Sequence, residues 1–462
     1  MVRSGDVRTV ADPTQAEPNP NKQAAADGSH GAPAARASIL QNPQLPVVLA
    51  LALFALTFAA GTLRWQAFYS EMGGPTGLLT QTDFPGLGLA SRMVASGRGG
   101  QLYDLKQQLL EQRRMTAEGS LSLSPADDAV LRYPYPYTPF LAVLWSPLAG
   151  LPLLSQMALY GLLNLAAFTV GLCLLLAALP LPGRTRLLFL LGALTSFPFI
   201  NNLEQGQSSG LVMLALGGGI ALMLRGKNLP AGLMLGLLVI KVQWLPLLVL
   251  VLLFKRQWRT LAGMLATGAV LCALSVLLMG TGWIGPYLSV LGQAQGYSRA
   301  LLLDPLYSHS FGGGLAALLA PGDDTIRTAS LVCTLACAGL LLAAWRGPWQ
   351  PGSLRWAGLM ALTIVAAVFS NVHVNTHDLC LLALPAALGC AYIAGSNAAD
   401  TIRTLWYGLL WAAYIVPAFL LPQTFAWPVR MTTLIMLLML GLLAWQLLSV
   451  QQKDGDPLAS QV

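Results

Sequence analysis

Long apolar runs, separated by short polar breaks, fill most of the chain after residue 44. A bilayer core takes about 20 apolar residues per helix, and the strict apolar-polar alternation of membrane barrel strands is absent. The pattern predicts an all-α polytopic membrane protein with about 11–13 transmembrane segments. The apolar segments are roughly 45–63, 138–151, 156–179, 186–200, 208–225, 231–241, 245–254, 261–279, 326–345, 354–370, 379–395, 404–421 and 428–448.

Several of these segments are too short or too interrupted for an upright crossing. Lys241–Trp244 and Pro246 separate the apolar runs 231–241 and 245–254. Irregular backbone is tolerated at membrane depth only where it lines a cavity or packs against protein. We therefore predict a re-entrant hairpin over 231–254, with Lys241 at its tip.

The polar segments divide the chain into three parts. Residues 1–42 are rich in Ala, Pro, Asn, Asp and Gln without an apolar face, which predicts a disordered cytoplasmic tail. Residues 43–450 form the predicted transmembrane domain, and 451–462 form a second cytoplasmic tail. Within the domain, 64–137 is a long first outer loop. Its periodic stretches Leu87–Ser96 and Leu105–Met115 predict short helices along the membrane interface.

Composition and charge support a membrane protein and suggest its orientation. Only 10% of residues are charged, against roughly 25% in soluble domains. The net charge of +7 is modest and indicates topology rather than nucleic-acid binding. Basic residues recur on one side, which we take as cytoplasmic, with both tails there: Arg184, Arg186, Arg225, Lys227, Lys255, Arg256, Arg259, Arg346, Arg355 and Arg403. The remaining polar loops then face outward from a multi-pass protein of the plasma membrane.

Asp83 is the candidate catalytic acid of the first outer loop. Phe84 and Pro85 follow it and restrict the backbone, and a predicted helix comes next. A partly desolvated carboxylate keeps enough basicity to accept a proton from a hydroxyl group. The alternative is an ordinary solvated loop acid.

Two further outward segments carry groups suited to a sugar phosphate. Asn201–Ser209 is rich in amides and hydroxyls, which can bind several sugar hydroxyls, although it also suits a polar turn. Lys241 interrupts an apolar run, where an unpaired charge is costly. It either meets a phosphate or extends its ammonium to water.

Three of the four histidines fall on the predicted outer face. His309 lies in a Ser-His-Ser sequence, and His373 and His377 precede Asp378. The spacing is a weak metal signal, so a substrate or structural role is the better interpretation, and we predict no metal. The six cysteines include no CxxC pair and suit small buried side chains. Motifs for nucleotide, serine or zinc hydrolysis are absent.

These residues, in this order, resemble the GT-C superfamily of membrane glycosyltransferases, and glycosyltransferase family 87 in particular. The resemblance covers most of 45–450. The chain departs from the family where it has Lys241-Val242 in place of Lys-Pro. The matching parts are Asp83-Phe84, Gly99–Asp104, Tyr133–Pro139, Asn201 to Gln207, Gly232 to Lys241 with Lys255–Arg259, and His309-Ser310.

The resemblance implies a GT-C fold, a polyprenyl-phosphate-sugar donor, inversion at the anomeric carbon and no cofactor. Asp83 would be the base, Lys241 and His309 would hold the donor phosphate, and Asn201 and Gln207 would contact sugar or acceptor. We also assign His377, Tyr103 and Tyr135 to substrate binding. The expected partners are the donor, which carries a hexose such as mannose, a lipid or glycan acceptor, and membrane lipids. We expect a monomer.

Two other activities remain open from the sequence. A secondary transporter would suit broken helices and a lysine at membrane depth. However, the broken segments have no counterpart after residue 260, so the repeat symmetry of transporters is missing. Another GT-C activity, such as a glycan polymerase or ligase, would share the fold and the basic residues.

Overall fold

The computed structural model describes residues 45–71, 79–294, 305–319, 322–419 and 426–449. The two predicted tails, 1–42 and 451–462, lie outside these residues. The chain divides into two compact units, 1–49 and 50–462. All that follows concerns the second unit, apart from the first residues of helix α2.

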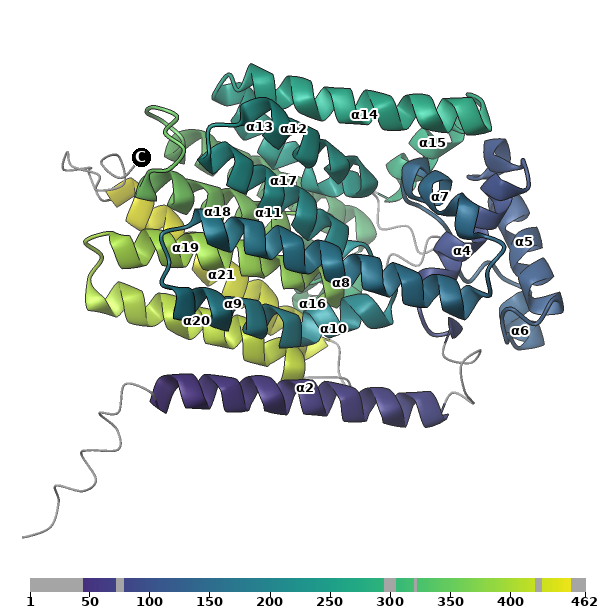
Figure 1. Cartoon of the computed structure of the whole chain (residues 1–462), viewed down its shortest axis with the longest axis horizontal. Helices are drawn as coiled ribbons and strands as arrows, with labels where there is room; N and C mark the ends of the chain where they lie inside the picture. Colours follow the sequence, from purple (N-terminus) through teal and green to yellow (C-terminus); the bar gives the residue numbers. More distant parts are fainter. Residues whose placement is uncertain (1–44, 72–78, 295–304, 320–321, 420–425, 450–462) are drawn as a thin grey trace, which may run out of the picture. The chain divides into compact units, whose positions relative to one another are not determined.

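The described part of the chain is a series of helices joined by loops, without strands (Figure 1). The prediction of an all-α polytopic membrane protein is confirmed. In chain order the helices of the first half are α2 Leu45–Glu71, α4 Phe84–Ala95, η1 Gly99–Gln101, α5 Leu105–Ala117, α6 Pro125–Asp128, α7 Pro139–Trp145, η2 Ser146–Leu148, α8 Leu153–Ala178, α9 Gly183–Thr195, α10 Phe197–Glu204 and α11 Ser209–Leu224. Those of the second half are α12 Asn228–Leu235, η3 Gly236–Trp244, α13 Pro246–Phe254, α14 Trp258–Met279, α15 Ile284–Ala294, η5 Pro305–Tyr307, α16 Phe311–Leu319, α17 Asp323–Ala344, α18 Leu354–Phe369, η6 Thr376–Leu382, α19 Ala383–Gly395, α20 Asp400–Phe419 and α21 Ala426–Ser449.

Five helical stretches in the described residues are long and apolar enough to cross a membrane, and a sixth crossing results if α9 and α10, bent by 45°, form one span. The five are Leu153–Ala178, Trp258–Met279, Asp323–Ala344, Thr376–Gly395 and Arg430–Ser449. Several other apolar helices are shorter, so the count of 11–13 crossings stays a prediction. Helix α2 also continues to Glu71, beyond its predicted end at residue 63.

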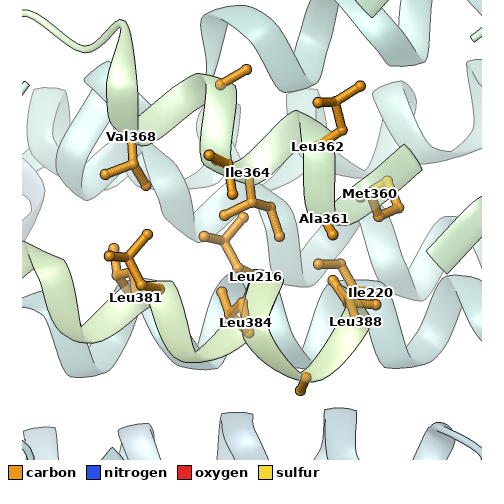
Figure 2. Close-up of a cluster of buried hydrophobic side chains, with 14 of the residues drawn as sticks. Leu216, Ile220, Met360, Ala361, Leu362, Ile364, Val368, Leu381, Leu384 and Leu388 are labelled. Carbon is orange, nitrogen blue, oxygen red and sulfur yellow. The ribbon is translucent and has the colours of Figure 1, made fainter. Parts of the chain in front are cut away.

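The largest core lies where α11, α18 and α19 meet. Leucine, isoleucine and methionine side chains from these helices interdigitate there with no exposure to solvent or nearly none (Figure 2). Because α18 is buried on almost every face, neighbouring helices surround it completely. This core supports η6, the short segment that precedes α19 and carries several polar residues.

Helices α12 and η3 run parallel to α14, and α13 leads the chain back to the start of α14. A Cβ atom at Gly232 would lie 2.0 Å from the Thr260 carbonyl oxygen, and one at Gly236 would lie 2.5 Å from Thr267. The chain thus advances in parallel with α14, and α13 then ends just before α14 begins. This path is that of a helical hairpin, and its re-entrant place in a membrane stays a prediction. Lys241 lies near its turn and has non-helical backbone angles, φ −130° and ψ 80°.

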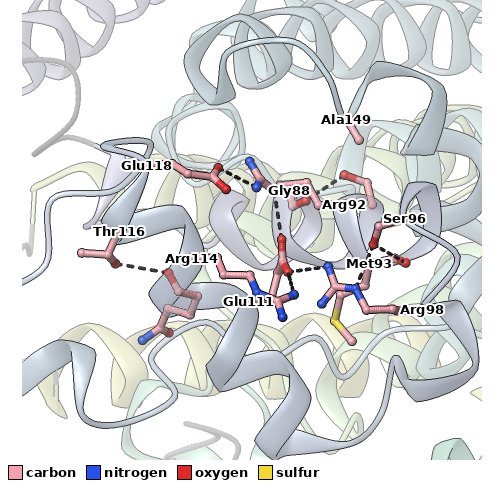
Figure 3. A network of polar contacts seen from close by, with 12 residues as sticks. Gly88, Arg92, Met93, Ser96, Arg98, Glu111, Arg114, Thr116, Glu118 and Ala149 are labelled. Atoms are coloured by element: carbon pink, nitrogen blue, oxygen red, sulfur yellow. Dashed lines mark hydrogen bonds and ion pairs between the residues drawn. The ribbon is translucent and has the colours of Figure 1, made fainter.

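An ion-pair network joins the two helices of the first loop (Figure 3). Glu111 on α5 is buried, and its carboxylate accepts hydrogen bonds from Arg92 on α4 (3.0 Å), Arg98 (2.5 Å) and Arg114 (3.3 Å). The helices match the predicted ones within a few residues. Residues of α4 face protein on nearly all sides, so packing within the protein holds α4. Its place at a membrane interface stays a prediction.

Candidate functional site

Asp83 lies at the beginning of α4, in contact with the turn after α10. Pro85 suits the first turn of a helix because it needs no backbone donor there. The backbone N–H of Asp83 donates to the Gln205 carbonyl at 3.2 Å. Gly206 has φ +63°, and a Cβ atom there would lie 2.6 Å from Phe84. Only glycine combines this angle with so close an approach, so it brings the two loops together.

Gln207 connects Asp83 to Tyr137. The Gln207 side-chain amide donates to Asp83 Oδ2 at 2.7 Å. The same amide lies 3.2 Å from the Tyr137 hydroxyl, which in turn donates to Gln207 Oε1 at 3.3 Å. Gln207 itself is buried. Three segments that are far apart in sequence therefore fix the position of one carboxylate.

The surroundings of Asp83 raise the pKa of its carboxyl group. Its side chain is exposed to solvent, yet protein atoms surround it closely enough for burial to raise its pKa above the ordinary value of 3.8. The Gln207 hydrogen bond and the charge of Lys241 lower the pKa, and the charge of Asp378 raises it, by smaller amounts. The result is a carboxylate that is reachable and more basic than a solvated one.

Lys241 forms a buried ion pair with Asp378. The ammonium nitrogen lies 2.8 Å from Asp378 Oδ1, and each side chain is 2% exposed. The Ser209 hydroxyl donates to the same oxygen at 2.9 Å, and the backbone N–H of Asn375 donates to the other oxygen at 3.3 Å. The lysine thus has a partner and does not extend to water. An ammonium has three donors, and Asp378 accepts one of these hydrogen bonds.

The two residues of this ion pair lie in two 3-10 segments. Lys241 occupies the kink in η3, and Asp378 lies at the third position of η6, where it completes a capping box with Asn375. Irregular turns of this kind inside apolar helices often mark functional positions. Because each segment is followed by a regular apolar helix, the charged residues sit at breaks between packed elements.

The three histidines that the sequence analysis singled out lie around the Lys241–Asp378 pair. His377 Nε2 lies 3.5 Å from Asp378 Oδ2. His309 places its ring nitrogens 2.6 Å from the Thr432 hydroxyl and 3.0 Å from the Thr376 hydroxyl. Burial lowers the pKa of both His309 and His373 to about 4. Both are therefore neutral near pH 7, so His309 adds no positive charge.

Of the two adjacent asparagines, the second is the more deeply placed. Asn201 is half-buried and lies 3.5 Å from Glu204. Asn202 is fully buried, and its carbonyl oxygen accepts from the Ser209 backbone N–H at 3.0 Å. Asn202 therefore joins α10 to the residue that also contacts Asp378. Sequence reasoning assigned Asn201 to sugar or acceptor binding and did not single out Asn202.

Tyr103 and Tyr135 hold the loop that carries Tyr137. The Tyr103 hydroxyl donates to the Tyr137 carbonyl at 2.7 Å, and the Tyr135 hydroxyl donates to the Thr138 carbonyl at 2.8 Å. Both side chains are buried. Their hydroxyls thus bond to the protein backbone, and Tyr137 is the tyrosine that connects to Asp83 through Gln207. Its place in the Tyr-Pro-rich segment was the available signal.

Several buried polar atoms around the site have no partner among the described residues. They are Thr138 Oγ1, Asn202 Nδ2 and His373 Nδ1. Buried polar atoms are nearly always hydrogen-bonded, so these atoms suit a polar ligand or water. No group of three or more His, Cys, Asp or Glu side chains in the described part of the chain is placed to hold a metal ion.

Comparison with known proteins gives one match. The model of glycosyltransferase family 87 matches residues 135–350. The matched segment includes Tyr137, Gln207, Lys241 and His309, and it ends before Asp378. No curated protein and no solved structure matches the chain. The resemblance to this family is confirmed, and it supports a membrane glycosyltransferase.

Proposed function

We propose that this membrane glycosyltransferase transfers a hexose, most simply mannose, from a polyprenyl-phosphate-sugar to the hydroxyl group of a lipid or glycan acceptor. The observation that carries the proposal is the convergence of Asp83 with the Lys241–Asp378 pair. Both charges act on Asp83 from nearby. A carboxylate base thus lies beside a cation, and transfer from a phosphate leaving group needs both.

Asp83 is the proposed base. An acceptor hydroxyl has a high pKa, so its attack on the anomeric carbon needs removal of its proton. Asp83 is exposed and therefore open to an acceptor, while Gln207 donates to its Oδ2 oxygen at 2.7 Å. Attack opposite the leaving phosphate then inverts the configuration at the anomeric carbon, with the proton transferred to Asp83.

Lys241 is the proposed partner of the donor phosphate. The departing phosphate is already an anion, so it needs positive charge and hydrogen-bond donors rather than an acid. The donors that Asp378 leaves available on the ammonium are suited to this task. Asp378 then holds the Lys241 ammonium in place while the site is empty, which makes Asp378 a positioning residue.

Neutral groups complete the proposed site. His309 connects its loop to Thr376 at 3.0 Å, which orders the start of η6. The unpartnered atoms of Asn202 and His373 are available for sugar hydroxyls. His377 contributes next to Asp378, whereas Tyr103 and Tyr135 act through the loop of Tyr137 rather than on substrate.

The location of the reaction follows from the pattern of basic residues. Lys255, Arg256 and Arg259 lie at the base of the re-entrant hairpin, and Lys241 lies near its turn. If the basic end is cytoplasmic, the site opens on the extracytoplasmic face of the plasma membrane. The donor and acceptor are then both membrane-borne or envelope molecules.

The test is transfer by purified protein. Wild-type protein in lipid vesicles is incubated with radiolabelled polyprenyl-phosphate-mannose and a lipid extract, and labelled products are separated from the donor. Transfer to an acceptor supports the proposal, and parallel assays with other polyprenyl-phosphate sugars identify the preferred one. Absence of transfer with every such donor would remove the proposed activity.

A further inference from the structure

A small pocket lies where the ends of α17, α18 and α21 meet. Its volume is about 240 Å³, somewhat below the roughly 300–1,000 Å³ of small-molecule sites, so it suits one small group. Three parts of the chain line it: the loop that follows α17, the first two turns of α18 and the last turn of α21. The pocket is separate from the groups assigned to sugar transfer.

Two arginines supply the charge of the pocket. Arg346, in the loop, is exposed, and Arg355, in the first turn of α18, is half-buried. No acidic residue of the described chain lines the pocket with them. Neither arginine takes part in an ion pair between described residues. Two like charges beside one pocket repel each other, and a bound anion would offset the repulsion.

Arg355 also has a structural role. Its Nη1 group donates to the Leu447 carbonyl of α21 at 2.9 Å, and its Nη2 group donates to the Ala344 carbonyl of α17 at 3.1 Å. A cation is favourable at these carboxyl-terminal helix ends. A guanidinium group has five N–H donors, so these two bonds leave others for a ligand. The Arg346 side chain bonds to no other residue of the described chain, so helix capping does not explain it.

The pocket includes the amino-terminal end of α18. This helix has 16 residues, and the first N–H groups of a helix have no carbonyl partner within it. The Ser353 hydroxyl accepts from the Trp356 N–H at 3.1 Å, which satisfies one of these groups. The N–H groups of Leu354 and Arg355 belong to the same turn. Together with the helix dipole, they favour a bound anion.

An unpartnered indole provides independent evidence for a ligand. Trp356 lines the pocket and is 1% exposed, yet its Nε1 atom has no hydrogen-bond partner among the described residues. Trp349 packs against it, with ring centroids 5.5 Å apart, and its Nε1 atom is unpartnered in the same way. In contrast, Trp345 of the same cluster donates to the Thr363 hydroxyl at 3.0 Å. Buried indole N–H groups usually have a partner, so the two unpartnered donors suit a ligand with acceptor atoms.

The rim of the pocket at α21 is apolar. Leu448 lines the pocket and is 51% exposed, and Trp445, one turn earlier on the same helix, is 55% exposed. Residues three apart lie on the same face of a helix. Tryptophan is enriched where membrane proteins meet the headgroup region of the lipids. A molecule with an anionic group and hydrocarbon chains would match both the arginines and this apolar face.

The pocket adjoins the base of the hairpin that carries Lys241. The ammonium of Lys255, just after α13, donates to the carbonyls of Trp345 and Gly347, and Gly347 lines the pocket. Helix α13 has nine residues, about 14 Å at 1.5 Å per residue, and it separates this end from the kink at Lys241. If the basic end is cytoplasmic, the pocket faces the leaflet opposite the proposed active site.

We propose that this pocket binds the phosphate group of an anionic phospholipid in the cytoplasmic leaflet, with the acyl chains along Trp445 and Leu448. Phosphate is favoured because the guanidinium, indole and backbone N–H groups are all donors, and a guanidinium binds a phosphate through two parallel hydrogen bonds. Basic pockets between membrane helices on this side suit such headgroups. A soluble phosphate compound has the same acceptor chemistry, but it would make no use of the apolar rim.

A bound phospholipid would stabilise the helix ends that form the pocket. The loop after α17, the buried helix α18 and the end of α21 all contribute to it. A ligand that binds only the folded state raises the free energy of unfolding, so phospholipid binding should raise the thermal unfolding midpoint. The inference goes beyond sugar transfer, and its tests need no sugar donor.

The binding test compares two arginines. Arg346→Gln removes a charge from the pocket, and Arg259→Gln removes an exposed charge outside the pocket at the same end of the molecule. Each purified protein is mixed with equal amounts of phosphatidylglycerol and phosphatidylcholine in detergent and examined by native mass spectrometry. We expect wild-type protein to retain phosphatidylglycerol preferentially. The preference should fall about tenfold or more in Arg346→Gln and less than about twofold in Arg259→Gln.

Two results of the binding test would overturn the inference. Equal retention of the two lipids by wild-type protein would mean that the pocket does not bind an anionic headgroup. Equal losses in Arg346→Gln and Arg259→Gln would mean that the basic end attracts anionic lipids through its overall charge, without a defined site. Because Arg346 is exposed, its substitution should leave the fold intact.

Thermal unfolding identifies the source of the phosphate. Phosphatidylglycerol in phosphatidylcholine nanodiscs should raise the unfolding midpoint of wild-type protein and of Arg259→Gln, and it should leave that of Arg346→Gln nearly unchanged. Inorganic phosphate added to nanodiscs of phosphatidylcholine alone should have no comparable effect. A rise with inorganic phosphate that Arg346→Gln abolishes would assign the pocket to a soluble phosphate compound and overturn the lipid assignment. No rise with either would overturn the inference as a whole.

Discussion

Lys241 and Asp378 are 137 residues apart in sequence, and their charged atoms lie 2.8 Å apart with almost no exposure. The two residues come from separate 3-10 segments, η3 and η6. A charge at this depth is stable only with a partner, so each residue accounts for the presence of the other. The charge of Lys241 also lowers the pKa of Asp83, and the following predictions test these roles.

Replacement of Asp83 tests the base. Asp83→Asn keeps the size and can still contact Gln207, but it cannot accept the acceptor proton. We expect transfer to fall by about 10²-fold or more, with donor binding retained. Turnover is measured with labelled donor and binding by displacement. Near-normal turnover would exclude Asp83 as the base.

The same variant should be more stable than wild type near neutral pH. The folded-state pKa of Asp83 is raised by burial, so its favourable contribution is present below the ordinary pKa of 3.8 and is lost as pH rises through the folded pKa. Asparagine carries no charge, so the substitution removes this loss of stability. Thermal unfolding in detergent at pH 7 should show a higher midpoint for Asp83→Asn, and a lower midpoint would contradict the raised pKa.

Gln207 should control the pH dependence of the reaction. Its 2.7 Å hydrogen bond to Asp83 lowers the pKa of that carboxyl. Gln207→Leu should therefore move the acid limb of the pH-rate profile to higher pH. Gln205→Leu is the matched control, since Gln205 contacts Asp83 through its backbone carbonyl. Identical acid limbs in the pH-rate profiles of Gln207→Leu and Gln205→Leu would mean that Gln207 only supports the fold.

A double-mutant cycle separates the two roles of Lys241. Lys241→Met leaves Asp378 buried without its cation, which should destabilise the protein by about 3–5 kcal/mol. Addition of Asp378→Asn removes the unpaired charge and should recover most of that stability. Transfer should stay low in the double variant because the phosphate still lacks a cation. Full recovery of transfer together with stability would make the pair purely structural.

Stability should fall as the solution is acidified from about pH 6.5 to about pH 4. The pKa values of His309 and His373 are lowered to about 4 by burial, and unfolded histidine titrates near 6.5. The unfolded chain therefore binds more protons in this window, so stability rises with pH there. His309→Gln should flatten the slope by up to about 1.4 kcal/mol per pH unit. An unchanged slope would indicate that His309 is hydrated.

Cysteine labelling tests the orientation. In a cysteine-free background, cysteine at Lys106 and cysteine at Arg259 are both at exposed positions. An impermeant maleimide added to intact cells should label the first and should label the second only after permeabilisation. Asp378 is unsuitable as a labelling position because it is buried. Labelling of position 259 in intact cells would contradict the proposed topology.

The sequence by itself determined the class of fold, because apolar length and the scarcity of charge leave few alternatives to membrane helices. It also predicted the hairpin around Lys241, since local breaks such as Val242–Pro246 interrupt an apolar run wherever that run is placed. Asp83 was chosen because Phe84 and Pro85 restrict the backbone after it. Gln207 was chosen from an amide-rich turn and from the resemblance to family 87.

Only the tertiary structure decided which polar groups bond to one another. The sequence indicated that Lys241 needed a partner, but not that Asp378 would supply it. It also did not show that Tyr137 bonds to Gln207, the partner of Asp83, while Tyr103 and Tyr135 support the loop. Nor did it show that Asn202 is more deeply buried than Asn201. These pairings depend on how η3, η6, α10 and the first loop pack. Hydrogen bonds between distant segments form only after that packing is set, and no local pattern encodes them.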